Sequence, residues 1–166
     1  MRLFERSMMM TDAVWRRHAN PFSVYSRFTV LPLLSLAIWS RDWIGPWAWL
    51  VVALALFWNW FNPRAFPPVS KIEGWASQGV WGERIFLNRT NATVAKEHAV
   101  FVYVLSALTG VFTLLLAWGL WELSVPTTVF SLILAVTFKT WTFDRMVWIY
   151  RDGDSAGRDF DNFSVS

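Results

Sequence analysis

The chain has 166 residues, of which 55% are hydrophobic and only 16% are charged. A soluble domain of this size usually has about a quarter of its residues charged, so this composition predicts a surface that faces lipid. The chain has no cysteine, which excludes disulfides, thiolate nucleophiles, iron–sulfur clusters and cysteine zinc sites. The formal net charge of +3 is small, and with this apolar composition it argues against a nucleic-acid partner.

The chain opens with a polar, basic segment ahead of the first apolar run. This segment, residues 1–27, is too long and too polar for the front of a signal peptide, so we expect an unprocessed chain. We predict that it lies on the cytoplasmic membrane surface, with a short amphipathic helix ending near Asn20. Its Arg16 and Arg17 suit anionic headgroups, whereas a ligand site that uses His18 and Asn20 is the alternative.

Four apolar runs are candidates for transmembrane helices, because about 20 residues of helix cross about 30 Å of hydrocarbon. The second and third runs are uncharged throughout, while Pro32 interrupts the first and Lys139 the fourth. Long basic side chains near a helix end can extend to the headgroups, which makes the weaker runs acceptable. The predicted spans are residues 24–40, 43–61, 99–121 and 126–150.

The positions of Lys and Arg predict the orientation, since cytoplasmic segments hold most of the positive charge. With four spans, 14 of the 15 Lys and Arg fall on one side and only Arg41 on the other. We therefore predict an all-α integral protein of the cell membrane, built as two helical hairpins with both termini in the cytoplasm. An interfacial cytoplasmic loop, residues 62–97, joins the hairpins, and residues 151–166 form a flexible tail.

The cytoplasmic loop contains the string EGWASQGVWGERIFLNRT, which predicts a short segment lying in the membrane interface. In that arrangement Trp81 enters lipid, while Glu83 and Arg84 stay in water. The dipeptide Asn62-Pro63 predicts a turn where the second span ends.

Polar side chains within the spans are expected to bond to other helices. Asn59 is the strongly polar residue of the second span, and Ser106 and Thr113 lie on a small, weakly polar face of the third. Helix packing explains that face better than conduction does, although an oligomeric channel or transporter stays open. Lys139 and Arg145 are expected at headgroup depth.

The two histidines, His18 and His98, fall short of any metal-ligand spacing among the scattered carboxylates, so we predict no metal site and no cofactor. A small membrane enzyme that acts on a lipid-borne or amphiphilic substrate is a second hypothesis. It would use one of these histidines as acid or base beside Glu83 and Arg84. Enzyme activity stays open, and a protein without it is the favoured interpretation.

The strings WRRHANPFSVYSRF, NPRAFPP and WASQGVWGER resemble those of an uncharacterised family of small prokaryotic multi-pass membrane proteins, catalogued as a domain of unknown function. The resemblance covers residues 15–89 and extends over most of the rest, and it implies a multi-pass membrane protein without implying an activity. Its motifs coincide with the predicted cytoplasmic boundary, which favours one polar cluster there. The predicted cluster is His18, Asn20, Arg27, Asn62, Arg64, Glu83, Arg84 and His98.

The favoured hypothesis is a membrane module whose cytoplasmic rim binds anionic lipid headgroups or a partner protein. The lipid bilayer is the expected partner, and self-association or a membrane protein partner stays open. The residues predicted to contact headgroups are Arg16, Arg17, Lys139 and Arg145.

Overall fold

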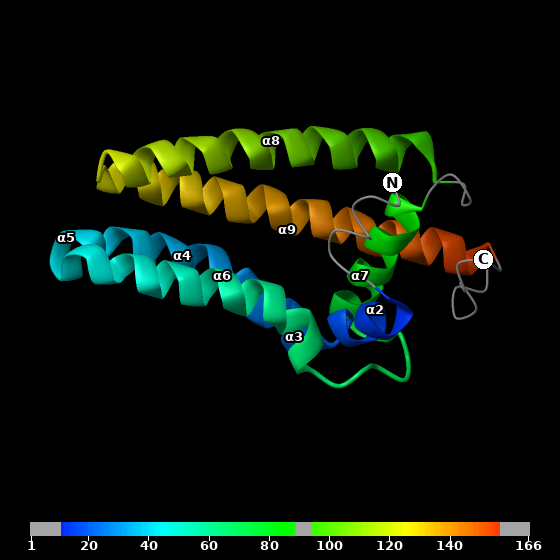
Figure 1. Cartoon of the computed structure of the whole chain (residues 1–166). Coiled ribbons are helices and arrows are strands. Elements are labelled where there is room, and N and C mark those ends of the chain that lie inside the picture. The colour runs from blue at the N-terminus through cyan, green and yellow to red at the C-terminus, as the bar shows by residue number, and fades with distance from the viewer. Residues whose placement is uncertain (1–10, 89–93, 157–166) are drawn as a thin grey trace.

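The computed structural model describes residues 11–88 and 94–156, and every regular element within these ranges is a helix (Figure 1). The predicted all-α class is confirmed. In chain order the helices are α2 (Asp12–His18), α3 (Pro21–Phe28), α4 (Val30–Trp39), α5 (Arg41–Ile44), the 3₁₀ turn η1 (Gly45–Trp47), α6 (Ala48–Ala65), α7 (Gly74–Leu87), α8 (Lys96–Trp121) and α9 (Val125–Ser155).

The first apolar run folds as two helices in series, α3 and α4, which meet at Thr29. Asn20 begins α3, because its side-chain oxygen accepts a hydrogen bond from the Phe22 N–H at 3.0 Å. Helical hydrogen bonding crosses the junction, since the Leu33 N–H donates to the Thr29 carbonyl at 3.0 Å. Pro32 lies in the first turn of α4, where a missing N–H leaves no hydrogen bond unmade.

Two tight turns lie at the same end of the molecule (Figure 1). In the first, α5 and η1 meet at Gly45, whose φ of +57° is a conformation that glycine adopts without strain. In the second, Leu123 between α8 and α9 has a φ of +52°. The predicted second span started at Trp43, but residues 43–47 belong to the first turn and α6 begins at Ala48.

The predicted turn at Asn62-Pro63 is wrong, because α6 continues through both residues to Ala65. The contacts of the Asn62 side chain explain why the Asn-Pro dipeptide does not form a turn here. It is fully buried, and it bonds to Ser23 and Ser26 of the neighbouring α3, so tertiary contacts hold this turn of helix.

The antiparallel helices α8 and α9 pack along their length (Figure 1). Their backbones lie close together beside their turn, where a Cβ atom on Gly119 would lie 2.9 Å from the Thr128 nitrogen. Helix α9 continues through Lys139 to Ser155, five residues beyond the predicted end of the fourth span at Tyr150.

The buried core lies at the end opposite the two turns, where α7 packs between α2 and α9. Two glycines explain this contact: a Cβ on Gly82 would lie 1.7 Å from the Met146 carbonyl oxygen, and one on Gly79 would meet the Phe143 ring at 2.2 Å. The prediction that α7 lies on the surface is therefore wrong, and Trp81 and Arg84 are buried. The main core cluster is Trp15, Ala19, Val24, Ala76, Val80, Trp81 and Phe143.

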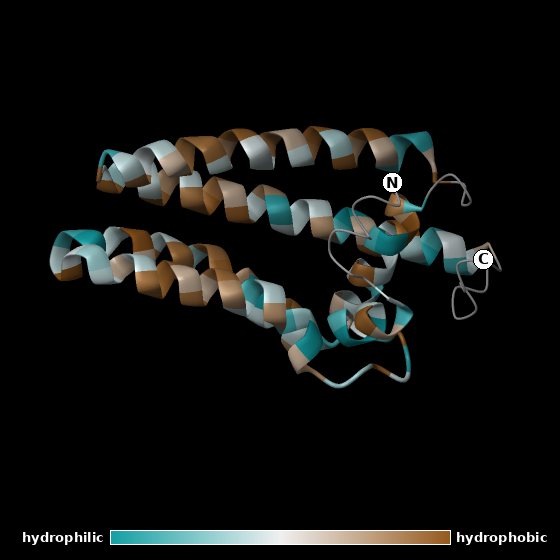
Figure 2. Cartoon of the chain, viewed as in Figure 1, coloured by the Kyte–Doolittle hydropathy of each residue, from teal (hydrophilic) through white to brown (hydrophobic). Residues whose placement is uncertain are grey.

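Two helical stretches, Pro21–Ala65 and Lys96–Trp121, are long and apolar enough to cross a membrane. Only 6% and 17% of their most apolar 18-residue windows are buried, unlike the core helix of a soluble protein. Figure 2 shows long hydrophobic stretches on α4, α6 and α8, and hydrophilic residues gathered toward α2, α7 and the end of α9. Within the described residues α9 is not apolar enough to count as a third such stretch, and Lys139 interrupts its apolar run.

Candidate functional site

His18 and Arg27 form the closest contact of the predicted polar cluster. An Arg27 terminal nitrogen (Nη1) lies 2.6 Å from His18 Nε2, and a second N–H donates to the His18 carbonyl at 3.4 Å. Arg27 Nε also donates to the Ser23 carbonyl at 3.2 Å. Because an arginine can only donate, His18 Nε2 must accept, and the ring is neutral with its proton on Nδ1.

The surroundings of His18 oppose its protonation. Burial lowers the pKa of His18, and the positive charges of Arg27 and Arg64 lower it further, from 6.5 to about 2. A histidine in this state is a very weak base at neutral pH. The structure therefore does not support His18 as the general base of the enzyme hypothesis.

A second set of polar contacts joins α3 to α6 and to the segment after it. Ser23 donates to the Asn62 side-chain oxygen at 2.7 Å, and the Asn62 amide donates to Ser26 Oγ at 2.7 Å. Asn20 uses both ends of its amide, because it caps α3 and donates to the Pro67 carbonyl at 3.1 Å. These buried bonds position α3 against α6.

Arg84 is buried in a different place from Arg27. Its side chain pairs with Asp12 at the start of α2, and its guanidinium lies 4.9 Å from the centre of the Trp81 ring and 6.0 Å from that of Trp15. The arginine fixes α2 on α7 by charge and by its flat face. Asp12 was missing from the predicted cluster, although an acidic residue in the first turn of a helix is a recognisable signal.

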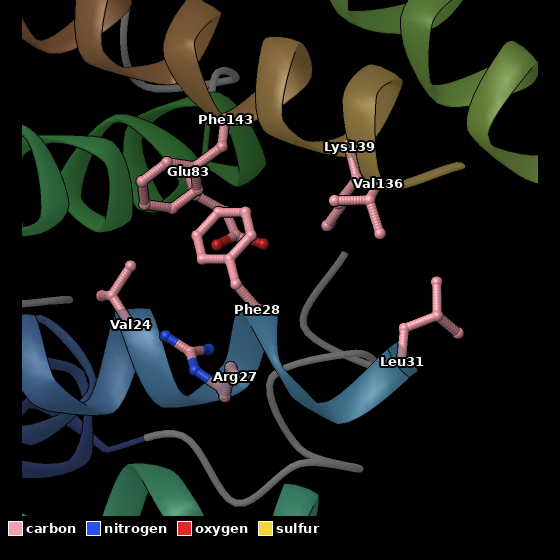
Figure 3. A pocket seen from close by; sticks show the side chains of 8 residues that line it. All are labelled: Val24, Arg27, Phe28, Leu31, Glu83, Val136, Lys139 and Phe143. Carbon is pink, nitrogen blue, oxygen red and sulfur yellow. The ribbon is translucent and has the colours of Figure 1, made fainter. Parts of the chain in front are cut away.

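Glu83 and Arg27 line one cavity of about 160 Å³ between α3, α7 and α9, together with Lys139 (Figure 3). Figure 3 shows the Glu83 carboxylate between α3 and α9, and the Arg27 guanidinium alongside α3. No hydrogen bond or ion pair within 4.0 Å joins the Glu83 or Lys139 side chain to another described residue. The remaining lining is apolar: Val24, Phe28, Leu31, Val136 and Phe143.

Arg64 lies at the end of α6, on the same side of the molecule as α2. It donates to the Trp60 carbonyl at 2.7 Å, and its guanidinium lies 4.5 Å from the centre of the Trp60 ring. The exposed Arg17 donates to the Arg64 carbonyl at 3.3 Å, while Arg16 lies 6.0 Å from the Trp81 ring centre. Basic and aromatic side chains therefore alternate over this edge.

His98 belongs to another part of the structure. Its Nε2 lies 2.7 Å from an Asp152 carboxylate oxygen, which ties the start of α8 to the end of α9. Arg145, on α9, lies over the Phe101 ring at 5.0 Å from its centre. The structure thus pairs the two histidines with different elements, and no group of three metal-ligating side chains occurs among the described residues.

Arg41 makes a contact that the sequence did not predict. One of its terminal nitrogens donates to the carbonyls of Leu120 and Trp121, at 2.7 and 2.6 Å. A positive charge is favourable at the C-terminal end of a helix, where carbonyls lack intrahelical partners. The available signal was that Arg41 is the single basic residue on the predicted outer side.

Comparison with known proteins gives a family match. The model described as "Family of unknown function (DUF6653)" matches residues 3–164. No curated protein and no solved structure matches the chain.

Proposed function

Because the chain belongs to DUF6653, a family of unknown function, we propose its role from the structure: a four-span membrane protein whose cytoplasmic rim binds anionic lipid headgroups. The spans are α3 with α4, α6, α8 and α9, arranged as two hairpins. The rim is defined as the edge that carries Arg16, Arg17 and Arg64.

The exposed apolar surface of the long helices is the observation that carries this proposal. Large side chains such as Leu114, Trp118 and Leu54 are 74%, 61% and 59% exposed. They lie on the faces of α6 and α8 that no other described helix covers. Soluble monomers rarely expose such continuous apolar surface, whereas lipid would cover it at no cost.

Aromatic residues support the same placement. Tyr103 and Trp121 on α8 are both exposed, and they lie about 27 Å apart along the helix at 1.5 Å per residue. That separation is close to the roughly 30 Å between the two interfaces of a bilayer, where such side chains concentrate. Exposed Trp43 and Trp47 surround the outer turn of the first pair.

The rim supports the choice of anionic lipid as ligand. Arg17 is exposed, Arg64 lies over the exposed Trp60 ring, and Arg16 is half-buried above Trp81. Positive charges at the membrane surface, here beside the exposed Trp60, attract the phosphates of an anionic leaflet by about 1 kcal/mol for each residue.

Quenching of tryptophan fluorescence by brominated lipids tests the proposal. The protein is reconstituted into phosphatidylcholine vesicles that contain brominated phosphatidylglycerol, or brominated phosphatidylcholine at the same fraction. We expect stronger quenching by the anionic lipid, and the combined change Arg16→Glu, Arg17→Glu and Arg64→Glu should reduce its enrichment about a hundredfold, as the loss of about 1 kcal/mol at each of three residues requires.

The matched control changes the same three residues to Lys, which keeps the charge and should keep the enrichment. Equal quenching by both lipids in the unaltered protein would contradict a rim that binds anionic lipid. Recovery of the protein in the soluble fraction, without detergent, would contradict the membrane location itself.

A further inference from the structure

The cavity between α3, α7 and α9 holds charges of both signs that the fold leaves available. Arg27 has five N–H donors and uses three of them for His18 and Ser23. Lys139 and the half-buried Glu83 make no hydrogen bond or ion pair with another described residue. Arg27, Glu83 and the exposed Lys139 therefore line one space of about 160 Å³.

A second, apolar cavity of about 270 Å³ shares one lining residue with the first. Leu31 on α4 lines both, and from there the apolar cavity passes between α4 and α8 toward the outer turns. Its lining includes Leu34, Ile38, Leu116, Ala117 and Leu120. A lipid that occupied both cavities would place its head among the charges and a chain along the apolar lining.

The charged cavity lies in the cytoplasmic half of the proposed bilayer, on the side of an inner-leaflet lipid. Arg27 lies about 20 Å along α3 and α4 from Ser40, and Lys139 about 21 Å along α9 from Val125. In a hydrocarbon layer of about 30 Å that begins at the outer turns, both residues lie about 10 Å inside the cytoplasmic boundary. Lys139 can extend from there to a phosphate.

We propose that the two cavities bind one phospholipid whose head carries a phosphate and a primary ammonium group, as in phosphatidylethanolamine. The phosphate lies between Arg27 and Lys139, the ammonium donates to the Glu83 carboxylate, and one acyl chain fills the apolar cavity. This inference rests on the proposed membrane location, and it concerns a site separate from the rim.

The charges of the cavity discriminate between headgroups. Phosphatidylglycerol has the phosphate but no cation, so its hydroxyls can donate to Glu83 without balancing the charge of the carboxylate. Phosphatidylcholine has a quaternary ammonium without an N–H, so it cannot donate a hydrogen bond to Glu83. A charge-assisted hydrogen bond contributes about twice as much as a neutral one, which favours the primary amine.

Native mass spectrometry of the full chain, released from detergent with all three lipids present at equal concentration and with equal chains, measures this preference. We expect phosphatidylethanolamine to be retained about tenfold more than the other two. Glu83→Gln should reduce it to their level, and Glu83→Asp should keep a preference. Lys139→Met should reduce retention of all three lipids, and Lys139→Arg should restore it.

Two matched controls separate the site from the rest of the surface. Lys96→Met removes an exposed lysine outside the cavity and should change nothing. Ala117→Phe fills the apolar cavity and should lower retention, whereas Ala107→Phe makes the same change on an exposed part of α8 that lines neither cavity.

Equal retention of the three lipids by the unaltered chain would overturn the proposal, and so would retention that Glu83→Gln and Ala117→Phe leave unchanged. Competition by soluble phosphoethanolamine at the concentration of the lipid would overturn the part played by the apolar cavity. If the chain needs detergent for extraction but retains no lipid, this lipid site alone is refuted. If the chain is soluble without detergent, the proposed membrane location is refuted as well.

Discussion

The contact between His18 and Arg27 fixes the protonation state of the histidine. Arg27 donates to His18 Nε2 at 2.6 Å, so the folded protein has a neutral ring, with a pKa near 2. In the unfolded chain the pKa of a histidine is about 6.5. Below pH 6.5 the unfolded state therefore binds a proton that the folded state does not, and stability falls as the pH falls.

For this pair we expect the free energy of unfolding to decrease by about 2 kcal/mol between pH 6.5 and 5, through His18 alone. Thermal unfolding in detergent, followed by circular dichroism, measures the slope. The variant His18→Gln still accepts from Arg27 but does not titrate, so its slope should be smaller by that amount. His98 is present in both proteins, and identical slopes would show that His18 is not the residue responsible.

Single residues also show what a sequence conceals. Asn59 was expected to bond to another helix, but it is exposed, and Asn62 makes the interhelical bonds instead. Both residues lie in one polar-aromatic stretch of the sequence. Which of them forms the interhelical bonds depends on where α3 packs, and the sequence does not show that. Arg84 was expected in water and is 3% exposed, because Asp12 and Trp81 supply its charge partner and its flat contact.

At the scale of elements, α7 depends on two glycines that bring its backbone against α9. A Cβ on Gly82 would lie 1.7 Å from a backbone oxygen of Met146, which no side-chain rotation can relieve. We expect Gly82→Ala to reduce the free energy of unfolding by about 3 kcal/mol, since α7 must move away from α9.

Gly110 in α8 is the matched control. A Cβ there meets nothing within 4 Å, so Gly110→Ala should leave stability unchanged or raise it by up to about 1 kcal/mol through helix propensity. Thermal unfolding of both variants in one detergent gives the comparison. Equal effects would show that the α7–α9 contact tolerates a side chain.

The helices themselves were largely predictable from the sequence. Apolar runs near the length of a bilayer located α6, α8 and the helical part of 24–40, whereas Asn20 was predicted only as the end of a helix and its capping of α3 was not foreseen. The packing of α7 was not predictable, because glycine permits close approach without indicating which helix approaches. The same holds for the cavity, whose charged residues come from three separate helices.

At the scale of the whole molecule, the proposed topology has a direct test, which the absence of cysteine makes simple. Single cysteines are introduced as Glu122→Cys, Lys71→Cys and Ser155→Cys, and intact cells are treated with a membrane-impermeant maleimide. We expect labelling of the first alone, because four spans place the α8–α9 turn outside and the other two positions inside.

After permeabilisation all three variants should react, while the unaltered chain stays unlabelled throughout. Reaction of the Ser155→Cys variant in intact cells would show that α9 does not cross the membrane and that the chain has three spans. Reaction of the Lys71→Cys variant would reverse the orientation of the first pair.

The bond from Arg41 to the end of α8 has a consequence for how the protein is made. In the proposed topology this arginine is carried across the membrane with the first pair of helices, before the chain that forms α8 has been synthesised. Its carbonyl partners on Leu120 and Trp121 arrive only with the second pair. The first pair is thus translated as an incomplete unit, and the Arg41 guanidinium gains these two acceptors only when the second pair reaches the same side.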